Sequence, residues 1–187
     1  GKILKNGKEV AIRNPNDANA LGIGMVHQHF KLVDVFTAAE NITLGLEEKL
    51  DLKATAARIR SICERYGFDL DPNQKIYDMS VSQKQTVEIV KVLYRGADTL
   101  ILDEPTRGID VGAKYEIYCI IADLAKQGKS IIMISSEMSE IIGMSNRVMV
   151  MCDGRITGFI NGKDATQENI MALATQFETA PTAAANQ

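Results

Sequence analysis

The stretch "TLILDEPTRGID" (residues 99–110) decides the fold of this chain. Its first four residues are apolar or β-branched and have the composition of a buried strand. The strand runs directly into two carboxylates, Asp103 and Glu104, and Pro105 then turns the chain sharply. Two adjacent acids at this place are compatible with a plain strand end that faces water, and equally with a site that carries chemistry.

The composition is that of an ordinary globular chain of one domain. Of its 187 residues, 45% are apolar and 24% are charged. Lys and Arg number 21 against 24 Asp and Glu, and no Lys/Arg-rich run stands out, so nucleic-acid binding has no electrostatic support. No apolar run approaches the ~18 residues of a membrane span. A role at a membrane would therefore require a partner chain. The three cysteines are odd in number and far apart, which predicts reduced thiols.

Apolar periodicity predicts strands that alternate with helices. The dipeptide Asn6-Gly7 favours a hairpin turn, and "GIGMVHQHF" (22–30) begins as a short strand. A less regular stretch is expected from Asn41. Ser80 is the expected cap of a helix, with Gln83 as its capping-box partner. Further expected elements are helices over 52–66, 113–128 and 137–144, a strand over 129–135 and a hairpin about Asp153-Gly154.

This alternation predicts an α/β fold with a mostly parallel sheet. Ligands of such sheets bind at the carboxyl ends of the strands. Asp103 and Glu104 follow the carboxyl end of one strand, so this context favours a functional site over a plain strand end. The final residues, 176–187, are expected to form a disordered tail.

Several segments, taken in order, resemble the ATP-binding cassette (ABC) proteins. "LILDEPTRGID" is similar to the Walker B motif and D-loop of this family, and "GIGMVHQHF" to its Q-loop. "MSVSQKQTVEI" (79–89) resembles the signature motif, usually written LSGGQ, and "KSIIMISSEMSEI" (129–141) resembles the H-loop strand. The resemblance covers roughly residues 1–175. It implies an ABC-type P-loop NTPase fold, with helices on both faces of the sheet and a small helical subdomain over about 35–95.

The resemblance also implies roles for individual residues. Asp103 would hold the water shell of Mg²⁺, Glu104 would accept a proton from the attacking water, and Gln28 would sense Mg²⁺ and the γ-phosphate. The remaining nucleotide contacts would come from Ser80, Gln83, Asp110 and Ser136. ATP and Mg²⁺ are the implied ligands. A second cassette and a membrane permease are the implied partners, with the protein at the cytoplasmic face of the cell membrane.

Three departures from the family pattern bear on activity. No segment of the 187 residues fits the phosphate loop G-x-x-x-x-G-K-[ST], which supplies the phosphate Lys and a Mg²⁺ hydroxyl. Val81 and Ser82 stand where the signature motif has two glycines, and their side chains crowd the approach to a γ-phosphate. Ser136 stands where the H-loop has His, and a Ser is shorter and uncharged. We therefore expect very weak ATP affinity and negligible hydrolysis by this chain alone, and Gly1 is expected to be a truncation point.

Two interpretations follow from these departures. In the first, the chain is a fragment of the ATP-binding subunit of a bacterial sugar importer. In the second, it is a non-catalytic module that supports a complete cassette or a permease. A chain that folds poorly because a central strand is absent is a further alternative. The residues 79–98 resemble the first cassette of tandem sugar or nucleoside ATPases, while 103–114 and 134–138 resemble the second. A join between the two at "ILDEPT" is a hypothesis that would account for this.

His27 and His29 alternate in sequence and could face one side of a strand. Two histidines with no third ligand nearby make a poor metal site. Polar residues that flank Gln28 are the simpler interpretation.

Overall fold

The computed structural model describes residues 1–46 and 51–176. Contacts divide the chain into two compact units, Gly1–Ile134 and the part that follows from Ser135. The expected disordered tail falls almost entirely on residues 177–187, which lie outside the described part of the chain.

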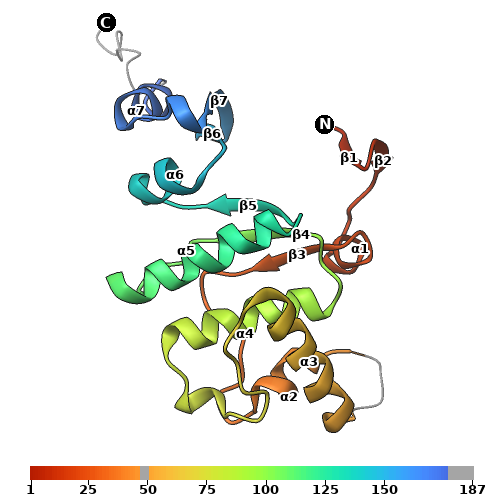
Figure 1. Cartoon of the computed structure of the whole chain (residues 1–187). Helices are drawn as coiled ribbons and strands as arrows, with labels where there is room; N and C mark the ends of the chain where they lie inside the picture. The colour runs from red at the N-terminus through yellow and green to blue at the C-terminus, as the bar shows by residue number, and fades with distance from the viewer. Residues whose placement is uncertain (47–50, 177–187) are drawn as a thin grey trace, which may run out of the picture. The chain divides into compact units, whose positions relative to one another are not determined.

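A three-stranded parallel sheet forms the centre of the first unit (Figure 1). Its strands are β3 (Ile23–Val26), β4 (Thr99–Asp103) and β5 (Ser130–Ile134), in the spatial order β3-β4-β5. Both pairs are parallel, and each connection passes through helices, as a crossover between parallel strands requires. The α/β fold with a parallel sheet, predicted from the sequence, is confirmed.

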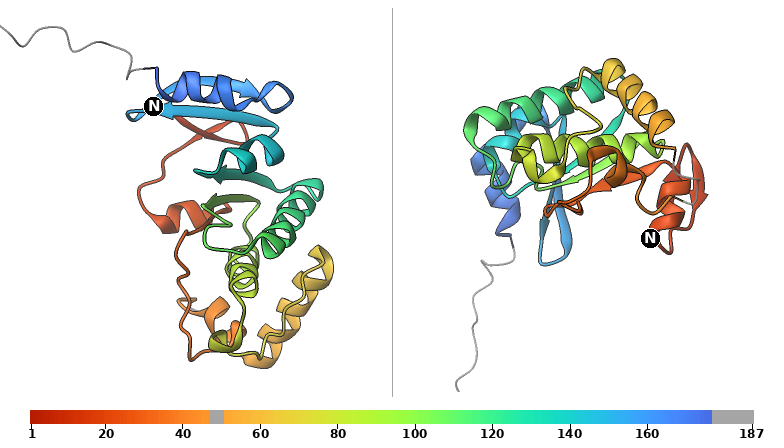
Figure 2. Two further views of the ribbon diagram at one scale, coloured as in Figure 1. Left: turned by 90° about the vertical axis from the view of Figure 1, so that its left-hand side faces the viewer. Right: turned by 90° about the horizontal axis from the view of Figure 1, so that it is seen from below.

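One face of this sheet is buried under two long helices, α4 (Val81–Tyr94) and α5 (Val111–Lys126) (Figure 2). Gly24 on β3 lies against α4, where a Cβ atom would come within 2.8 Å of the Cβ of Val92. Leu100 and Leu102 of β4 share this face and are fully buried. Side chains of the opposite face are more exposed, and Ile132 of β5 keeps 51% of its surface accessible.

Further helices pack beside α4. The predicted helix over 52–66 is confirmed as α3 (Leu52–Tyr66), which is held to α4 by a hydrogen bond of 2.7 Å from Arg58 to the Tyr94 carbonyl oxygen. The expectation of a less regular stretch from Asn41 is wrong at its start. Asn41 lies inside a short helix, α2 (Ala38–Thr43), which is stabilised by a capping box between Thr37 and Glu40.

Smaller elements complete the first unit. Asn6 and Gly7 both have positive φ angles, 52° and 77°, as the predicted two-residue hairpin requires. The elements are β1 (Ile3–Lys5), β2 (Lys8–Val10), α1 (Pro15–Ala20) and the 3₁₀ turn η1 (Ile76–Asp78).

The second unit is an antiparallel hairpin packed against helices. Val148, Val150 and Ile170 form its core with partly buried neighbours. The turn at Asp153-Gly154, predicted from the sequence, is confirmed by positive φ angles at both residues. The elements are α6 (Met138–Met144), β6 (Arg147–Cys152), β7 (Arg155–Asn161), the turn η2 (Gly162–Asp164) and α7 (Gln167–Ala174).

Candidate functional site

The two carboxylates occupy a tight turn at the carboxyl end of β4. Asp103 is the last residue of the strand. Glu104 has a φ of 47°, a left-handed conformation that non-glycine residues seldom adopt. Its backbone N–H donates to the Ile134 carbonyl oxygen at 2.8 Å, and its own carbonyl accepts from the Arg107 N–H at 3.1 Å. The backbone of Glu104 is therefore fixed from both sides, and such strained positions are concentrated at functional sites.

Gln28 reaches the same edge of the sheet from the neighbouring strand. β3 ends at Val26, which pairs in register with Leu102 of β4. Gln28 follows two residues after Val26, and Asp103 follows directly after Leu102. Two side chains with oxygen ligands thus leave adjacent parallel strands at one edge, which is where ligands of such sheets bind. Both residues are half-buried.

The histidines beside Gln28 do not lie on a strand. β3 ends before His27, and both His27 and His29 are exposed in an irregular segment. Within residues 1–46 and 51–176, no group of three or more His, Cys, Asp or Glu side chains is arranged to hold a metal ion.

Ser80 and Gln83 form the capping box that the sequence predicts. The Ser80 hydroxyl accepts from the Gln83 N–H at 3.2 Å, and the Gln83 side chain accepts from the Ser80 N–H at 2.9 Å. Ser82 lies 3.1 Å from Ser80, hydroxyl to hydroxyl, and the Val81 side chain is exposed. In this conformation both polar side chains cap α4, so their predicted contacts with a phosphate would have to add to these hydrogen bonds or replace them.

Asp110 and Ser136 have different surroundings. Asp110 is exposed and caps α5, since its carboxylate accepts from the Ala113 N–H at 3.0 Å. Ser136 is exposed and belongs to the second unit. The roles of both residues in nucleotide binding remain predictions.

Buried polar side chains that were not predicted from the sequence hold the loop that follows Gln28. Asn41, fully buried, accepts from the Val33 N–H at 2.7 Å and donates to the Val33 carbonyl at 3.1 Å. Glu88 of α4 accepts from the Lys31 N–H at 2.7 Å. The capping-box pattern at Thr37 would have revealed the helix that carries Asn41. No comparable sequence signal marks Glu88.

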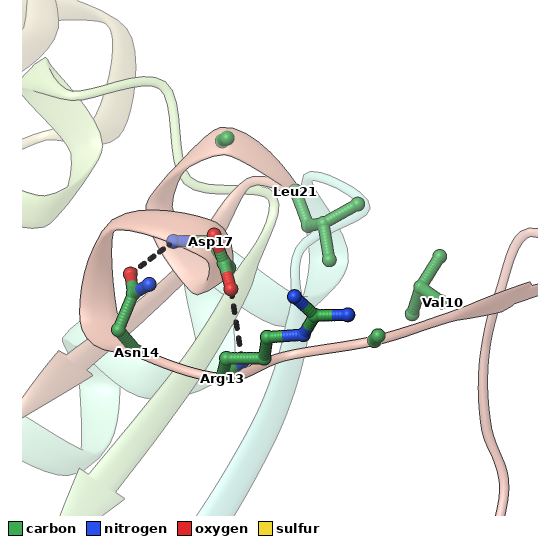
Figure 3. A pocket seen from close by; sticks show the side chains of 7 residues that line it. Val10, Arg13, Asn14, Asp17 and Leu21 are labelled. Atoms are coloured by element: carbon green, nitrogen blue, oxygen red, sulfur yellow. Dashed lines mark hydrogen bonds between the residues drawn. The ribbon is translucent and has the colours of Figure 1, made fainter.

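A shallow pocket of about 540 Å³ lies elsewhere in the first unit, beside α1 (Figure 3). Asp17 accepts the backbone N–H of Arg13 at 2.9 Å, and Asn14 caps α1 through the N–H of Asp17 at 3.0 Å. The pocket contains none of the predicted site residues. Its lining residues are Val10, Ala11, Arg13, Asn14, Asp17, Ala20 and Leu21.

The fold and the sheet-edge site define a class of protein, the ATP-binding cassette. The ABC transporter family matches residues 1–107, more than half of the chain, and the chain belongs to this family. Among solved structures, CbiO1 of Clostridium perfringens, part of the ABC transporter complex CbiONQ, has a TM-score of 0.75 at 25% identity. This match covers 96% of our chain and 73% of that one.

Curated relatives are more specific. The galactose/methyl galactoside import ATP-binding protein MglA of Clostridium tetani is 46% identical over 95% of this chain. The guanosine import ATP-binding protein NupO of Bacillus subtilis is 43% identical over 92% of it. The chain spans just over a third of the length of these relatives, 37% and 35% respectively. Among the residues that the structure describes, no helix has both the length and the hydropathy needed to cross a membrane.

The family binds ATP or ADP, generally with Mg²⁺, and part of the necessary chemistry is present here. Asp103 supplies a carboxylate and Gln28 an amide oxygen, and both are ligands that Mg²⁺ accepts, directly or through water. Mg²⁺, when bound with a nucleotide, neutralises charge on the phosphates. No segment of the 187 residues fits the sequence pattern of the phosphate loop, which in the family supplies a backbone cradle and a Lys.

Proposed function

We propose that this chain is part of the ATP-binding subunit of a bacterial ABC importer for a sugar or nucleoside. Its place would be at the cytoplasmic face of the membrane, where ATP hydrolysis is coupled to uptake. The observation that supports this most is the placement of Gln28 and Asp103 at the same edge of the sheet, at the ends of adjacent parallel strands and next to the fixed turn at Glu104. The names of the relatives, which are galactoside and guanosine import ATP-binding proteins, agree with it.

In this proposal each polar residue has a distinct task. With Mg²⁺ and a nucleotide bound, Asp103 would hold the water shell of the metal ion, and Gln28 would sense the metal ion and the γ-phosphate. Glu104 accepts the proton of the attacking water, and its strained backbone keeps the carboxylate aimed at one place. Ser80, Gln83 and Asp110 face the nucleotide of a second cassette, while Ser136 replaces the usual His.

A chimera tests this assignment. Residues 1–175 would replace the matching segment of Clostridium tetani MglA, which aligns over 188 residues. We expect ATPase activity that Glu104→Gln lowers at least about 100-fold, the lower bound for removing a general base. The matched control is Glu168→Gln, an exposed acid in the first turn of α7. Equal activity of the two variants would refute the role of Glu104.

The isolated chain provides the complementary test. Because the phosphate loop is absent from its 187 residues, calorimetric titration with ATP and Mg²⁺ should show no binding up to millimolar nucleotide. Binding at micromolar ATP would mean that other residues replace the phosphate loop, and it would contradict this part of the proposal.

The partner surface is proposed to include Val35 and Tyr77. Their side chains are 64% and 61% exposed, and their segments are joined by the Tyr77 N–H donating to the Asp34 carbonyl at 3.1 Å. Exposed apolar groups of this size are suited to docking a permease loop. In the chimera, replacing both with Ser should abolish uptake and leave ATP hydrolysis in place. Unchanged uptake would exclude this surface.

A non-catalytic supporting module is the second candidate. The substitutions that favour it are Val81 and Ser82 at the two glycine positions of the signature, with Val81 exposed. Such a module would offer its signature to a complete cassette without hydrolysing ATP itself. In the chimera, Val81→Gly together with Ser82→Gly should raise ATPase activity if the side chains crowd the nucleotide. Unchanged ATPase activity would mean that the signature motif tolerates the side chains of Val81 and Ser82.

A further inference from the structure

Two side chains of α4 form hydrogen bonds with the backbone of the loop that carries Gln28. Glu88 accepts from the Lys31 N–H at 2.7 Å, and the Lys91 amine donates to the Lys31 carbonyl oxygen at 3.2 Å. Both backbone groups of one loop residue are thus held by one helix. Glu88 and Lys91 are also 4.0 Å apart, carboxylate to amine, one helical turn from each other. We call Glu88 and Lys91 the α4 clamp.

The clamp is buried to a degree that is unusual for charged side chains. The exposed fraction is 5% for the Glu88 side chain and 14% for that of Lys91. Burial lowers the pKa of Lys91. The nearby Glu88 carboxylate raises this pKa and so offsets part of the shift. A buried ion pair seldom adds stability over apolar residues of similar size. Core packing alone therefore does not explain why these two buried positions carry charged side chains.

The position of the clamp gives a better reason. β3 ends at Val26, and the α4 clamp binds the backbone of Lys31. Residues 27–30 are therefore an irregular connector between the end of β3 and the residue that is attached to α4. Gln28 lies within this connector. A second grip follows at Val33, from Asn41 on α2. The loop beyond Lys31 is thus attached to α4 and α2, and residues 27–30 link this loop to β3.

We propose that Glu88 and Lys91 are positioning residues for Gln28, through which the placement of α4 sets the placement of Gln28. Since Ser80 caps the N-terminus of α4, the same helix carries the signature residues at that end and holds Lys31 two to three turns later. Engagement of Ser80 by a nucleotide would then be transmitted to Gln28 in the same chain. This consequence for ATP rests on the proposed function, whereas the clamp itself does not.

Backbone amide hydrogen exchange and amide chemical shifts of the ¹⁵N-labelled chain test the clamp without nucleotide. Glu88→Ala should speed exchange at Lys31 at least about tenfold, since a lost hydrogen bond to a charged acceptor is of that size. The Gln28 signals should shift, because the connector loses its anchor. Val33 should keep its protection through Asn41. Lys91→Met should have the same pattern with a smaller effect.

A conservative variant separates positioning from general structural support. Glu88→Gln keeps an acceptor for the Lys31 N–H and should restore most of the protection and the native Gln28 signals. Faster exchange that spreads evenly over α4 and the loop would refute the proposal, as would a freed Lys31 with unchanged Gln28 signals. Should Glu88→Ala fail to fold, Lys91→Met and Glu88→Gln carry the same comparison. A failure of ATP hydrolysis in the chimera would leave these measurements unaffected.

Discussion

Replacing Gly24 with Ala should destabilise the chain, because β3 and α4 approach too closely for a side chain. An added Cβ atom would lie 2.8 Å from the Cβ of Val92, 3.1 Å from its Cγ1 and 3.1 Å from the Cβ of Ala97. Carbon atoms in contact prefer about 3.5–4.0 Å. Helix and strand would have to separate by roughly 0.7–1.2 Å at the shortest contact to restore that spacing.

The expected magnitude follows from two opposing effects. Overpacking a well-packed core costs about 1–3 kcal/mol. Replacing Gly lowers the entropy of the unfolded chain, which offsets about 0.5–1 kcal/mol. The net loss in free energy of unfolding should therefore be about 1 kcal/mol for mid-range values, with an upper limit of about 2.5 kcal/mol. Because β3 leads directly to Gln28, any separation of β3 from α4 would also disturb the connector.

Urea unfolding, followed by circular dichroism, measures this loss. Gly112→Ala is the matched control, because Gly112 lies in the first turn of α5 and an added Cβ would meet only Asp110 Oδ1, at 3.4 Å. That variant should be neutral or up to about 1 kcal/mol more stable. The losses in free energy of unfolding from Val92→Ala and Gly24→Ala should be less than additive in the double variant, since the 3.1 Å contact with Val92 Cγ1 disappears. A Gly24→Ala chain as stable as the parent would refute the reasoning from close packing.

Three further predictions concern strain, thiol chemistry and charge. Glu104→Gly should be about 1 kcal/mol more stable than Glu104→Ala in urea, because only Gly adopts the φ of 47° without strain; equal stabilities would mean that the turn relaxes. Burial raises the pKa of the Cys63 thiol to about 11, so iodoacetamide at pH 8 should label exposed Cys119 far faster than Cys63. Cys63 should gain reactivity only as the pH approaches 11. Comparable labelling rates of the two thiols at pH 8 would contradict the burial of Cys63. The hydrogen bond from Lys5 lowers the pKa of the Asp98 carboxyl. This contact therefore stabilises the fold above the unfolded-state pKa of Asp98, about 3.9, and the stabilisation is lost as the pH falls below that value. Lys5→Met should therefore make the free energy of unfolding depend less on pH between about pH 4 and pH 2. An unchanged pH dependence would exclude the contact.

The sequence predicts those parts of the fold that periodic patterns specify. Apolar residues recurring at helical spacing placed the helix over 52–66 at the bounds that the structure has. The Asn6-Gly7 and Asp153-Gly154 turns were equally predictable, because few dipeptides tolerate two positive φ angles. The capping box at Ser80 fixed the start of α4. In each case the information is local, confined to a few neighbouring residues.

The site was predictable only in outline. A parallel sheet brings the ends of its strands to one edge, so Asp103 and Gln28 could be placed there once the fold class was known. The left-handed backbone at Glu104 was not predictable, since it depends on a hydrogen bond to Ile134, 30 residues further along the chain. The case of α2 is different, because its capping box at Thr37 is a local signal that would have predicted the helix.

The α4 clamp was invisible in the sequence for a physical reason. On the predicted helix, Val87 and Val90 mark the inward face, and a Glu between them reads as a solvated residue. Its partner is a backbone N–H 57 residues away, and every residue except Pro offers that group. Side chain to backbone contacts of this range leave no pattern in composition or spacing. A charged residue on the border of an apolar helix face is therefore worth testing as a loop anchor whenever an irregular segment with a functional residue packs against that helix.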